Sequence, residues 1–255
     1  MIRKPLLMML LFAVFAISCG WFETDAEPQP RLSMFVGVDI SGSFVKGDYF
    51  DDALNFLSYY IYCHLHALDD LKEPNVLFVG AIGGAREGEP KTFFPIQTFE
   101  NKSIEEIRTQ LKEIFPKEGI NPYTDYNAFF EQVATTVRNR NLLLRPISIV
   151  MLSDGVPDVE SSQAADYESI DLSPLEKLAR SITVRLLYTD AATAKKWQTL
   201  VSRRRVKMWT QDAKVMTSWN DETIFVPNQP IEEQTRFFEW LKDNVDFGVR
   251  SAFLR

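Results

Sequence analysis

A short polar segment that follows an apolar run has the residue types of a cation site. The run over residues 34–40 ends in Asp39 and Ile40, and Ser41, Gly42 and Ser43 follow it. Carboxylate and hydroxyl oxygens suit hard cations such as Mg²⁺, which takes about six oxygen ligands and keeps waters among them. In open α/β sheets, ligands bind at the carboxyl ends of the strands. The segment therefore predicts a divalent-cation site at the end of a strand.

The same residue types also suit ordinary turns. Asp and Ser side chains accept hydrogen bonds from nearby backbone N–H groups and are common in turns for that reason. A second segment, Asp154 followed by Gly155, comes after the apolar run over residues 147–152 and could likewise be a tight turn. The cation site is favoured because both segments follow runs that are predicted to be buried strands.

With these segments the sequence resembles the von Willebrand factor A (vWA) family. That family has a metal-ion-dependent adhesion site (MIDAS) written Asp-x-Ser-x-Ser, followed by a distant Thr and a distant Asp. The matching residues, in order, are Asp39, Ser41, Ser43, Thr124 and Asp154. The resemblance covers about residues 32–243. It implies a vWA-like α/β fold in which these five residues bind Mg²⁺, or Mn²⁺ or Ca²⁺ in its place.

The match departs from the family pattern around the threonine. Family members commonly have Gly immediately or closely before it, whereas here Pro122 and Tyr123 precede Thr124 and the nearest preceding glycine is Gly119. The match is therefore weakest at Thr124. The neighbouring Asp125 could add charge near the ion or begin the next helix.

The resemblance also implies how such a site is used. In the family, the hydroxyls contact the ion directly or through water, the aspartates often act through water, and a vacant position accepts a carboxylate from the partner. A site with few negative charges of its own leaves the cation able to bind an external oxygen. We therefore expect a binding module, not an enzyme, that captures an exposed Asp or Glu of a protein partner.

Two other classes of function fit parts of the sequence. A Mg²⁺-dependent phosphohydrolase or phosphotransferase could use Asp39 as a nucleophile at the end of the first strand. Haloacid-dehalogenase-like enzymes usually have Asp-x-Asp there, whereas this chain has Ser41 at the second position. A structural component of an envelope assembly could instead keep the fold with a degenerate metal site.

The elements that must position these residues alternate between strands and helices. Four runs are apolar on both faces, which predicts strands of a mostly parallel sheet buried under helices. They cover residues 34–40, 76–82, 147–152 and 182–188. Helical spacing is clearest over residues 49–68. The alternation predicts an α/β fold with a doubly wound, mostly parallel sheet flanked by helices.

The remaining predicted elements are shorter. Further helices are expected over residues 104–115, 127–137, 175–179 and 191–201. Residues 92–99 alternate like an edge strand or a hairpin arm, and short strands are expected over residues 205–209 and 223–227. A last amphipathic helix is expected over residues 231–247, which completes one domain over residues 32–255.

The first 18 residues have the layout of a secretory signal peptide. Arg3 and Lys4 precede an apolar run over residues 5–17, which is too short for a comfortable membrane span, and small Ser18 precedes Cys19. Residues 16–19 resemble a bacterial lipobox, with Ala where the usual motif has Leu, and this predicts lipidation of Cys19. An ordinary signal peptide cut near the same place, or an uncleaved anchor, is the alternative.

The leader predicts where the protein is located. Residues 19–31 would form the lipidated cysteine and a short solvated tether, and the acyl chains would hold the domain on a membrane surface. The expected location is the bacterial cell envelope, outside the cytoplasm. Gly20, in place of an Asp, favours the outer membrane. The net charge of −7, from 28 basic and 35 acidic residues, argues against a nucleic-acid partner.

Three further groups are predicted to have no role in chemistry. Cys63 is expected to be a buried, inert thiol, although a bridge to Cys19 is possible if Cys19 is not lipidated. His64 and His66 lie two apart on a predicted helix, so they cannot form an i, i+4 metal pair, and both are expected to be partly exposed. The run 203–205, three arginines, could touch anionic lipid but better suits the negative end of a helix dipole.

Overall fold

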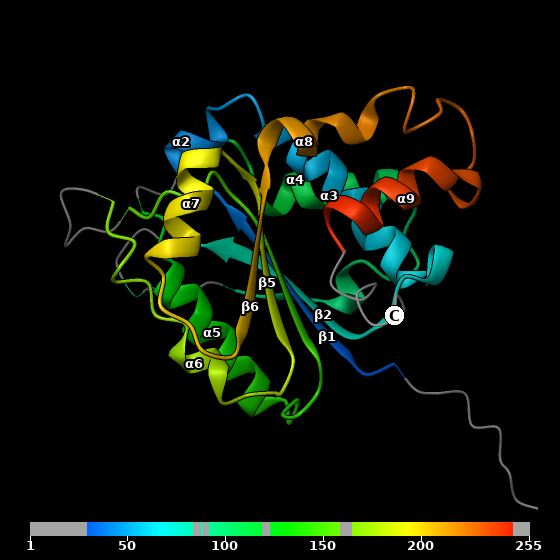
Figure 1. Cartoon of the computed structure of the whole chain (residues 1–255). Coiled ribbons are helices and arrows are strands. Elements are labelled where there is room, and N and C mark those ends of the chain that lie inside the picture. The colour runs from blue at the N-terminus through cyan, green and yellow to red at the C-terminus, as the bar shows by residue number, and fades with distance from the viewer. Residues whose placement is uncertain (1–29, 84–87, 89–91, 119–122, 159–164, 247–255) are drawn as a thin grey trace, which may run out of the picture.

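The protein is built around one sheet that lies between two layers of helices (Figure 1). The computed structural model describes residues 30–83, 88, 92–118, 123–158 and 165–246. Within these residues the sheet has six strands in the order β3-β2-β1-β4-β5-β6. The strands are β1 (Leu32–Asp39), β2 (Pro74–Ile82), β3 (Phe94–Pro95), β4 (Ile147–Leu152), β5 (Ile182–Thr189) and β6 (Val206–Asp212). The predicted doubly wound, mostly parallel α/β sheet is confirmed.

The parallel part of the sheet is buried on both faces. All the strand pairs are parallel except β2–β3, which is antiparallel. Every residue of β4 is buried, and β1 and β5 are buried almost throughout. Strands covered on both faces need apolar side chains in both directions, which is why these runs lack polar alternation. The side chains form two separate apolar clusters, one on each face.

One face is covered mainly by four helices, which contribute nearly half of the residues of the first cluster. They are α3 (Phe50–Leu65), α4 (Ile104–Ile114), α8 (Ala213–Thr217) and α9 (Thr235–Asn244). α3 begins with Asp51 and Asp52 in its first turn, where negative charge stabilises a helix. α4 begins with a capping box between Ser103 and Glu106. The local sequence thus fixes where these helices begin.

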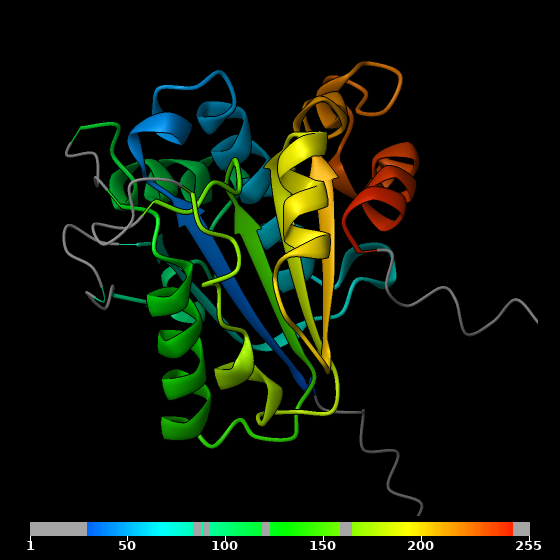
Figure 2. The same ribbon diagram turned by 60° about the vertical axis from the view of Figure 1, so that its left-hand side comes forward.

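The other face is covered by α5 (Tyr126–Asn139), α6 (Ser173–Glu176) and α7 (Ala191–Thr199), which lie in front of the sheet in Figure 2. α5 begins at Asp125, whose side chain accepts the Ala128 N–H, and α7 begins at Asp190, which accepts two backbone N–H groups. Both aspartates therefore start helices. A four-residue helix, α2 (Gly42–Val45), follows β1 directly.

The strand predicted over residues 223–227 is wrong. These residues form turns in which Ile224 and Phe225 donate backbone hydrogen bonds to the Asp221 carbonyl, and the Asp221 carboxylate accepts the Thr223 N–H. Side chains that bond to nearby backbone compete with strand pairing. The apolar residue Phe225 packs against the aromatic rings of Trp219 and Phe237 and does not belong to a strand.

Two other predicted elements are shorter than expected. The edge strand over residues 92–99 is reduced to the two residues of β3, followed by the 3₁₀ helix η2 (Ile96–Thr98). The single helix over residues 231–247 is divided into η4 (Ile231–Glu233) and α9, with Gln234 between them at ψ 60°. The Gln234 side chain donates to the Val226 carbonyl and accepts the Val226 N–H, which holds the chain out of helical geometry.

The leader and its cysteine lie outside the described residues. The predicted signal peptide, Cys19 and the tether therefore stay predictions. Among the residues that the structure describes, no helix is long and apolar enough to cross a bilayer. Cys63 lies on α3 with its side chain fully buried, as predicted, and burial raises the pKa of its thiol.

A buried ionic cluster ties α3 and the end of α9 to the sheet. The Asp246 carboxylate lies 3.0 Å from His64 Nε2 and 3.3 Å from an Arg185 guanidinium nitrogen, and it accepts the Tyr60 hydroxyl. His64 is 3% exposed, so the expectation that it is partly exposed is wrong. Burial alone would raise the pKa of Asp246, but the hydrogen bond and charge of His64 and the charge of Arg185 lower it.

We expect Asp246→Asn to lower the free energy of unfolding by about 3 kcal/mol, because it leaves Arg185 buried without its counter-charge. Urea unfolding would measure this, with Glu239→Gln, an exposed position on α9, as the control. A carboxylate whose folded pKa is lowered stabilises the fold above its unfolded pKa of about 3.9, and this contribution is lost as pH falls through the folded value. The free energies of unfolding of the wild type and of Asp246→Asn should therefore converge below about pH 4.

Candidate functional site

The five predicted ligands lie at the carboxyl ends of the parallel strands. Asp39 is the last residue of β1, and Asp154 lies two residues beyond β4. β1 has β2 on one side and β4 on the other, so the strand order reverses here, at the place where open α/β sheets bind ligands. In Figure 2 the arrowheads of β1 and β4 lie side by side at the top of the sheet, below α2.

The carboxylate of Asp39 is the centre of the site. The side chain is fully buried. Oδ1 accepts the Ser41 N–H at 2.8 Å and lies 3.5 Å from the Thr124 hydroxyl, while Oδ2 accepts the Ser153 hydroxyl at 2.6 Å. Both oxygens are therefore bonded to residues that come from three different loops.

The two serines of the first segment present their hydroxyls to each other. Ser41 Oγ and Ser43 Oγ are 3.1 Å apart. Ser41 is the residue before α2, but its side chain makes no capping hydrogen bond, so its hydroxyl is not used by the helix. Ser41 is buried next to Asp39, whereas Ser43 is exposed. The two serine hydroxyls therefore lie between the buried Asp39 carboxylate and the surface of the protein.

Thr124 is held in the site by its backbone. It forms an isolated antiparallel bridge with Asp158, with its N–H 2.7 Å from the Asp158 carbonyl. Gly83, just after β2, has φ +74°, and a Cβ there would lie 2.3 Å from the Tyr123 carbonyl. The loop can approach the end of β2 only because residue 83 is a glycine. The glycine that makes room for this loop therefore follows β2, whereas vWA family members commonly have a glycine just before the threonine.

Asp125 begins a helix, which was one of its two predicted roles. One carboxylate oxygen accepts the Ala128 N–H and caps α5, while the other accepts the Gly88 N–H at 2.8 Å. These bonds turn the carboxylate toward α5 and the segment after β2. Within the residues that the structure describes, the Asp125 side chain forms no hydrogen bond with any of the five predicted ligands.

Asp154 stands on a turn that is packed against the second face of the sheet. Its Oδ1 accepts the Val156 N–H at 3.0 Å. Gly155 has φ +83° and is surrounded by side chains of β5 and α7, and the Trp197 indole donates to its carbonyl at 2.7 Å. Contacts with β5 and α7 thus hold the turn in place, and Asp154 remains partly exposed at the surface.

Charge repulsion is built into the site. Burial and the nearby charge of Asp154 raise the pKa of Asp39 from its ordinary 3.8 to about 6, although hydrogen bonds from Ser153 and Ser41 partly offset this. None of the described groups that shift this pKa is basic. In the part of the chain that the structure describes, no positive side chain therefore balances the repulsion between the two carboxylates.

Ser153 is a site residue that the sequence analysis missed. Its hydroxyl donates to Asp39 and also accepts the Gly155 N–H at 2.9 Å. The Tyr126 hydroxyl lies 2.6 Å away and donates to Ser153, because the single Ser153 proton is already used. β1 and β4 pair Val38 with Leu152, so Asp39 and Ser153 are the next residues along adjacent strands. That parallel register is the signal that could have found Ser153.

These residues fit a hard divalent cation. The site combines two carboxylates with three hydroxyls, which is an oxygen-only donor set of low charge. Within the described residues, no group of three or more His, Cys, Asp or Glu side chains could hold a metal ion. Such a group would be needed for a softer metal or an all-carboxylate site, whereas three of the five residues here are serines or a threonine that offer hydroxyl oxygens. A cation would also balance the repulsion between Asp39 and Asp154.

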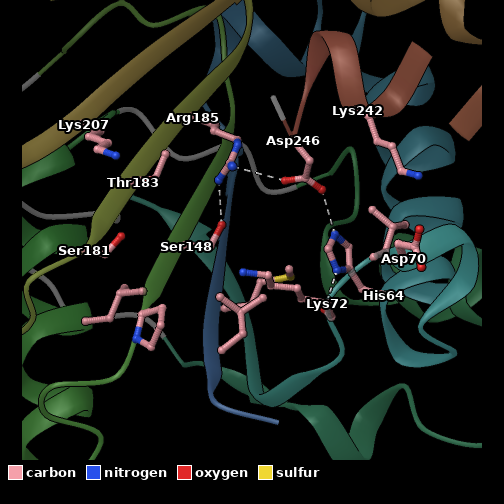
Figure 3. Close-up of a pocket in the computed structure, with 15 residues that line it drawn as sticks. His64, Asp70, Lys72, Ser148, Ser181, Thr183, Arg185, Lys207, Lys242 and Asp246 are labelled. Atoms are coloured by element: carbon pink, nitrogen blue, oxygen red, sulfur yellow. Dashed lines mark hydrogen bonds and ion pairs between the residues drawn. The ribbon is translucent and has the colours of Figure 1, made fainter. Parts of the chain in front are cut away.

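A pocket of about 440 Å³ lies elsewhere, at the amino ends of the strands (Figure 3). Leu32, Ile147 and Ser148 line it at the start of β1 and β4, and the Arg185–Asp246 pair borders it. None of the five predicted ligands is among its lining residues. The pocket is therefore separate from the candidate metal site.

Comparison with known proteins gives no family assignment. No protein-family model matches the chain, and no curated protein matches it. Among solved structures, proximal thread matrix protein 1 from the mussel byssus, with a zinc-occupied MIDAS motif, is 10% identical at a TM-score of 0.44. The pilus adhesin SpaC from Lactobacillus rhamnosus GG is also 10% identical at 0.44, and the SpRpn10 VWA domain is 10% identical at 0.38.

The match to these structures is partial. This chain is covered over 73% by the mussel protein, 85% by the adhesin and 71% by the SpRpn10 domain. The matched regions span 45%, 31% and 87% of those proteins, respectively. With identities near 10% and TM-scores below 0.5, these likenesses establish neither family nor function. What is established is the α/β fold with a mostly parallel sheet and the convergence of five predicted residues at its carboxyl edge.

We expect Gly83→Ala to destabilise the protein more than Gly88→Ala does. Both glycines have a positive φ, at +74° and +72°, so each alanine carries the same backbone penalty of about 1 kcal/mol. Only at Gly83 would the new Cβ meet the Tyr123 carbonyl, whereas at Gly88 nothing lies within 4 Å. Overpacking should add roughly 1–3 kcal/mol, measurable by urea unfolding. Equal losses would mean that the close approach does not position the Thr124 loop.

Proposed function

We propose that this protein is a binding module that captures an acidic residue of a protein partner through a divalent cation, Mg²⁺ being the favoured ion. The cation would be held by Asp39, Ser41, Ser43, Thr124 and Asp154, in the manner of the vWA family that the sequence resembles. The observation that carries the proposal is the convergence of three loops on the Asp39 carboxylate, with two hydroxyls of the first loop only 3.1 Å apart.

The layering of the site supports capture of an external ligand. Asp39, Ser41 and Thr124 are buried, while Ser43 is exposed and Asp154 partly exposed. The buried residues would hold the cation from below, and the outer two would border the side that a partner approaches. When bound, Mg²⁺ would supply a coordination position that a carboxylate oxygen of the partner can fill.

The burial of Asp39 argues against the phosphohydrolase alternative. An aspartate nucleophile must reach the phosphorus atom, yet this carboxylate is fully buried and both of its oxygens accept hydrogen bonds. A hydroxyl, Ser41, lies where a second acid would be needed. The position of Asp39 therefore suits an indirect role, in which its carboxylate holds the neighbouring groups in place.

The structural-component alternative differs in one measurable property. A degenerate site would keep the fold, and any partner would bind equally well with a chelator present. The repulsion between the buried Asp39 carboxylate and the nearby, partly exposed Asp154 favours a site that is filled by a cation, because a buried carboxylate beside a like charge is destabilised when no cation is present.

The cellular setting is a second part of the proposal. Residues 1–18 would direct secretion and lipidated Cys19 would anchor the domain at the bacterial envelope, with the outer membrane favoured. The partner would then be a protein outside the cytoplasm. Mass determination of the protein from membranes of the producing cell would show the acyl chains on Cys19 or their absence.

We expect Mg²⁺ to bind saturably to the full chain in isothermal titration calorimetry, and Mn²⁺ to bind as well. Asp39→Asn and Asp154→Asn should each lose binding, because each removes half of the carboxylate charge in the donor set. Asp221→Asn is the matched control, since this aspartate lies in an exposed turn outside the site. Circular dichroism of each variant would show that the fold is kept.

Two results would oppose the metal site. Equal affinity in Asp221→Asn and Asp154→Asn would place the cation elsewhere on the protein. Saturable binding that survives Asp39→Asn would remove the central residue from the donor set. A partner search run in Mg²⁺ against a chelator would then no longer be justified by this site.

We expect no hydrolysis of a generic phosphate ester in the presence of Mg²⁺, because Asp39 is inaccessible as a nucleophile. A chromogenic phosphate ester would serve as substrate, with Asp39→Asn measured beside the wild type. Turnover that Asp39→Asn abolishes would contradict the binding-module proposal and support the hydrolase.

A further inference from the structure

Basic residues gather at the amino ends of the parallel strands. Within the two residues that precede each of β1, β2, β4, β5 and β6, the chain has six basic residues and one acid, Glu73. We call these six the basic edge: Arg31, Lys72, Arg145, Arg180, Arg204 and Arg205. Five of them are exposed and Arg145 is partly exposed. Because the five strands are parallel, all of these side chains lie at one end of the domain.

The opposite end of the sheet is acidic. β1 and β6 finish on Asp39 and Asp212, Asp190 directly follows β5, and Asp154 lies two residues beyond β4. The chain as a whole has a net charge of −7. A basic edge on an acidic protein is therefore a local feature of one end, and it points away from the candidate metal site.

Two leucines project from the basic edge. Leu143 is 48% exposed and Leu144 is 77% exposed, in the loop between α5 and β4. Leu144 has φ +65°, a conformation that costs about 1–2 kcal/mol for a residue with a side chain. Its N–H donates to the Leu178 carbonyl at 2.9 Å, and the neighbouring Leu142 is buried. The loop is thus held in a form that presents apolar side chains outward.

Most of the nearby cations are not neutralised within the described part of the chain. Arg203 donates to carbonyls at the end of α7, which confirms the helix-end role predicted for the 203–205 run at that one residue. Arg180 and Arg205, by contrast, have no side-chain partner among the described residues. Lys72 and Lys207, which line the pocket of Figure 3, likewise form no ion pair there. Their charges remain available to a ligand.

We propose that the basic edge and its two leucines dock on the surface of an anionic lipid bilayer. Lysine and arginine side chains bind the anionic lipid head groups, and Leu143 and Leu144 enter the apolar boundary beneath them. The described chain begins at residue 30, beside this same edge. The candidate metal site then faces away from the bilayer, toward a partner.

A bilayer fits this surface better than a nucleic acid does. Nucleic acid would also bind cations, but it offers nothing for two adjacent exposed leucines, and the strongly negative protein would be repelled along most of its surface. An interface that combines separated cations with protruding aliphatic side chains is that of a peripheral membrane protein. The inference does not depend on metal binding, so the metal titration and the membrane test can fail independently.

The test is a fluorescence measurement on the full chain with Cys19→Ser, which leaves buried Cys63 as the one native thiol. A polarity-sensitive probe is attached through Leu144→Cys or, as the matched control at the acidic end, through Val156→Cys, which is 36% exposed. Vesicles of phosphatidylcholine, alone or mixed with phosphatidylglycerol, carry a nitroxide quencher in the lipid phase. Any insertion of the apolar leader is common to both positions, so the difference between them reports the orientation of the domain.

We expect quenching at position 144 with phosphatidylglycerol vesicles, little with phosphatidylcholine alone, and none at position 156. Raising the salt to about 0.5 M shortens the Debye length to roughly 4 Å and should reverse the quenching. Arg180→Glu combined with Arg205→Glu should abolish it. Lys112→Glu combined with Lys195→Glu, exposed positions on α4 and α7, makes the same change in net charge and should leave it unaltered.

Four results would overturn the proposal. Quenching at position 156 in place of 144 would mean that the opposite end faces the membrane. Equal quenching at 144 with both kinds of vesicle would remove the role of the cations. Absence of quenching at both positions, or the same loss in both pairs of charge variants, would show that the basic edge is not a membrane-binding surface.

Discussion

The buried carboxylate of Asp39 is the group on which the candidate metal site depends. A carboxylate removed from water must be matched by hydrogen-bond donors or by a cation. Here the donors are the Ser41 N–H, the Thr124 hydroxyl and the Ser153 hydroxyl, each from a different loop. The hydrogen bonds to this one carboxylate therefore bring together the loops after β1 and β4 and the loop before α5.

Because the strands are parallel, the candidate metal site and the basic edge lie at opposite ends of the sheet. In a parallel sheet all the amino ends lie at one edge and all the carboxyl ends at the other, so residues far apart in the chain meet by strand polarity alone. The aspartates after β1, β4 and β5 gather in this way, and so do the bases before the strands. The ionic cluster of Arg185, His64 and Asp246 lies near the basic edge, where it joins α3 and α9 to the sheet.

The errors of prediction arise where a polar side chain forms hydrogen bonds that the apolar pattern does not reveal. Residues 223–227 and Gln234 were assigned from local apolar spacing, yet in both places a polar side chain bonds to nearby backbone and prevents regular structure. His64 is buried instead of partly exposed because its ring nitrogens bond to the Lys72 carbonyl and to Asp246, which lie 8 and 182 residues away in the sequence. Local spacing contains no information about such partners.

The alternation of buried strands and helices and the choice of the five predicted ligands could be read from the sequence, because apolar periodicity and residue type are local properties. The hydrogen bond from Ser153 to Asp39 could not be read from the sequence, since it follows from the register between β1 and β4. The tertiary structure also shows that the glycine which makes room for the Thr124 loop is Gly83, which follows β2. Close approach and charge grouping are relations between distant segments, and these relations exist only once the sheet has set its order and register.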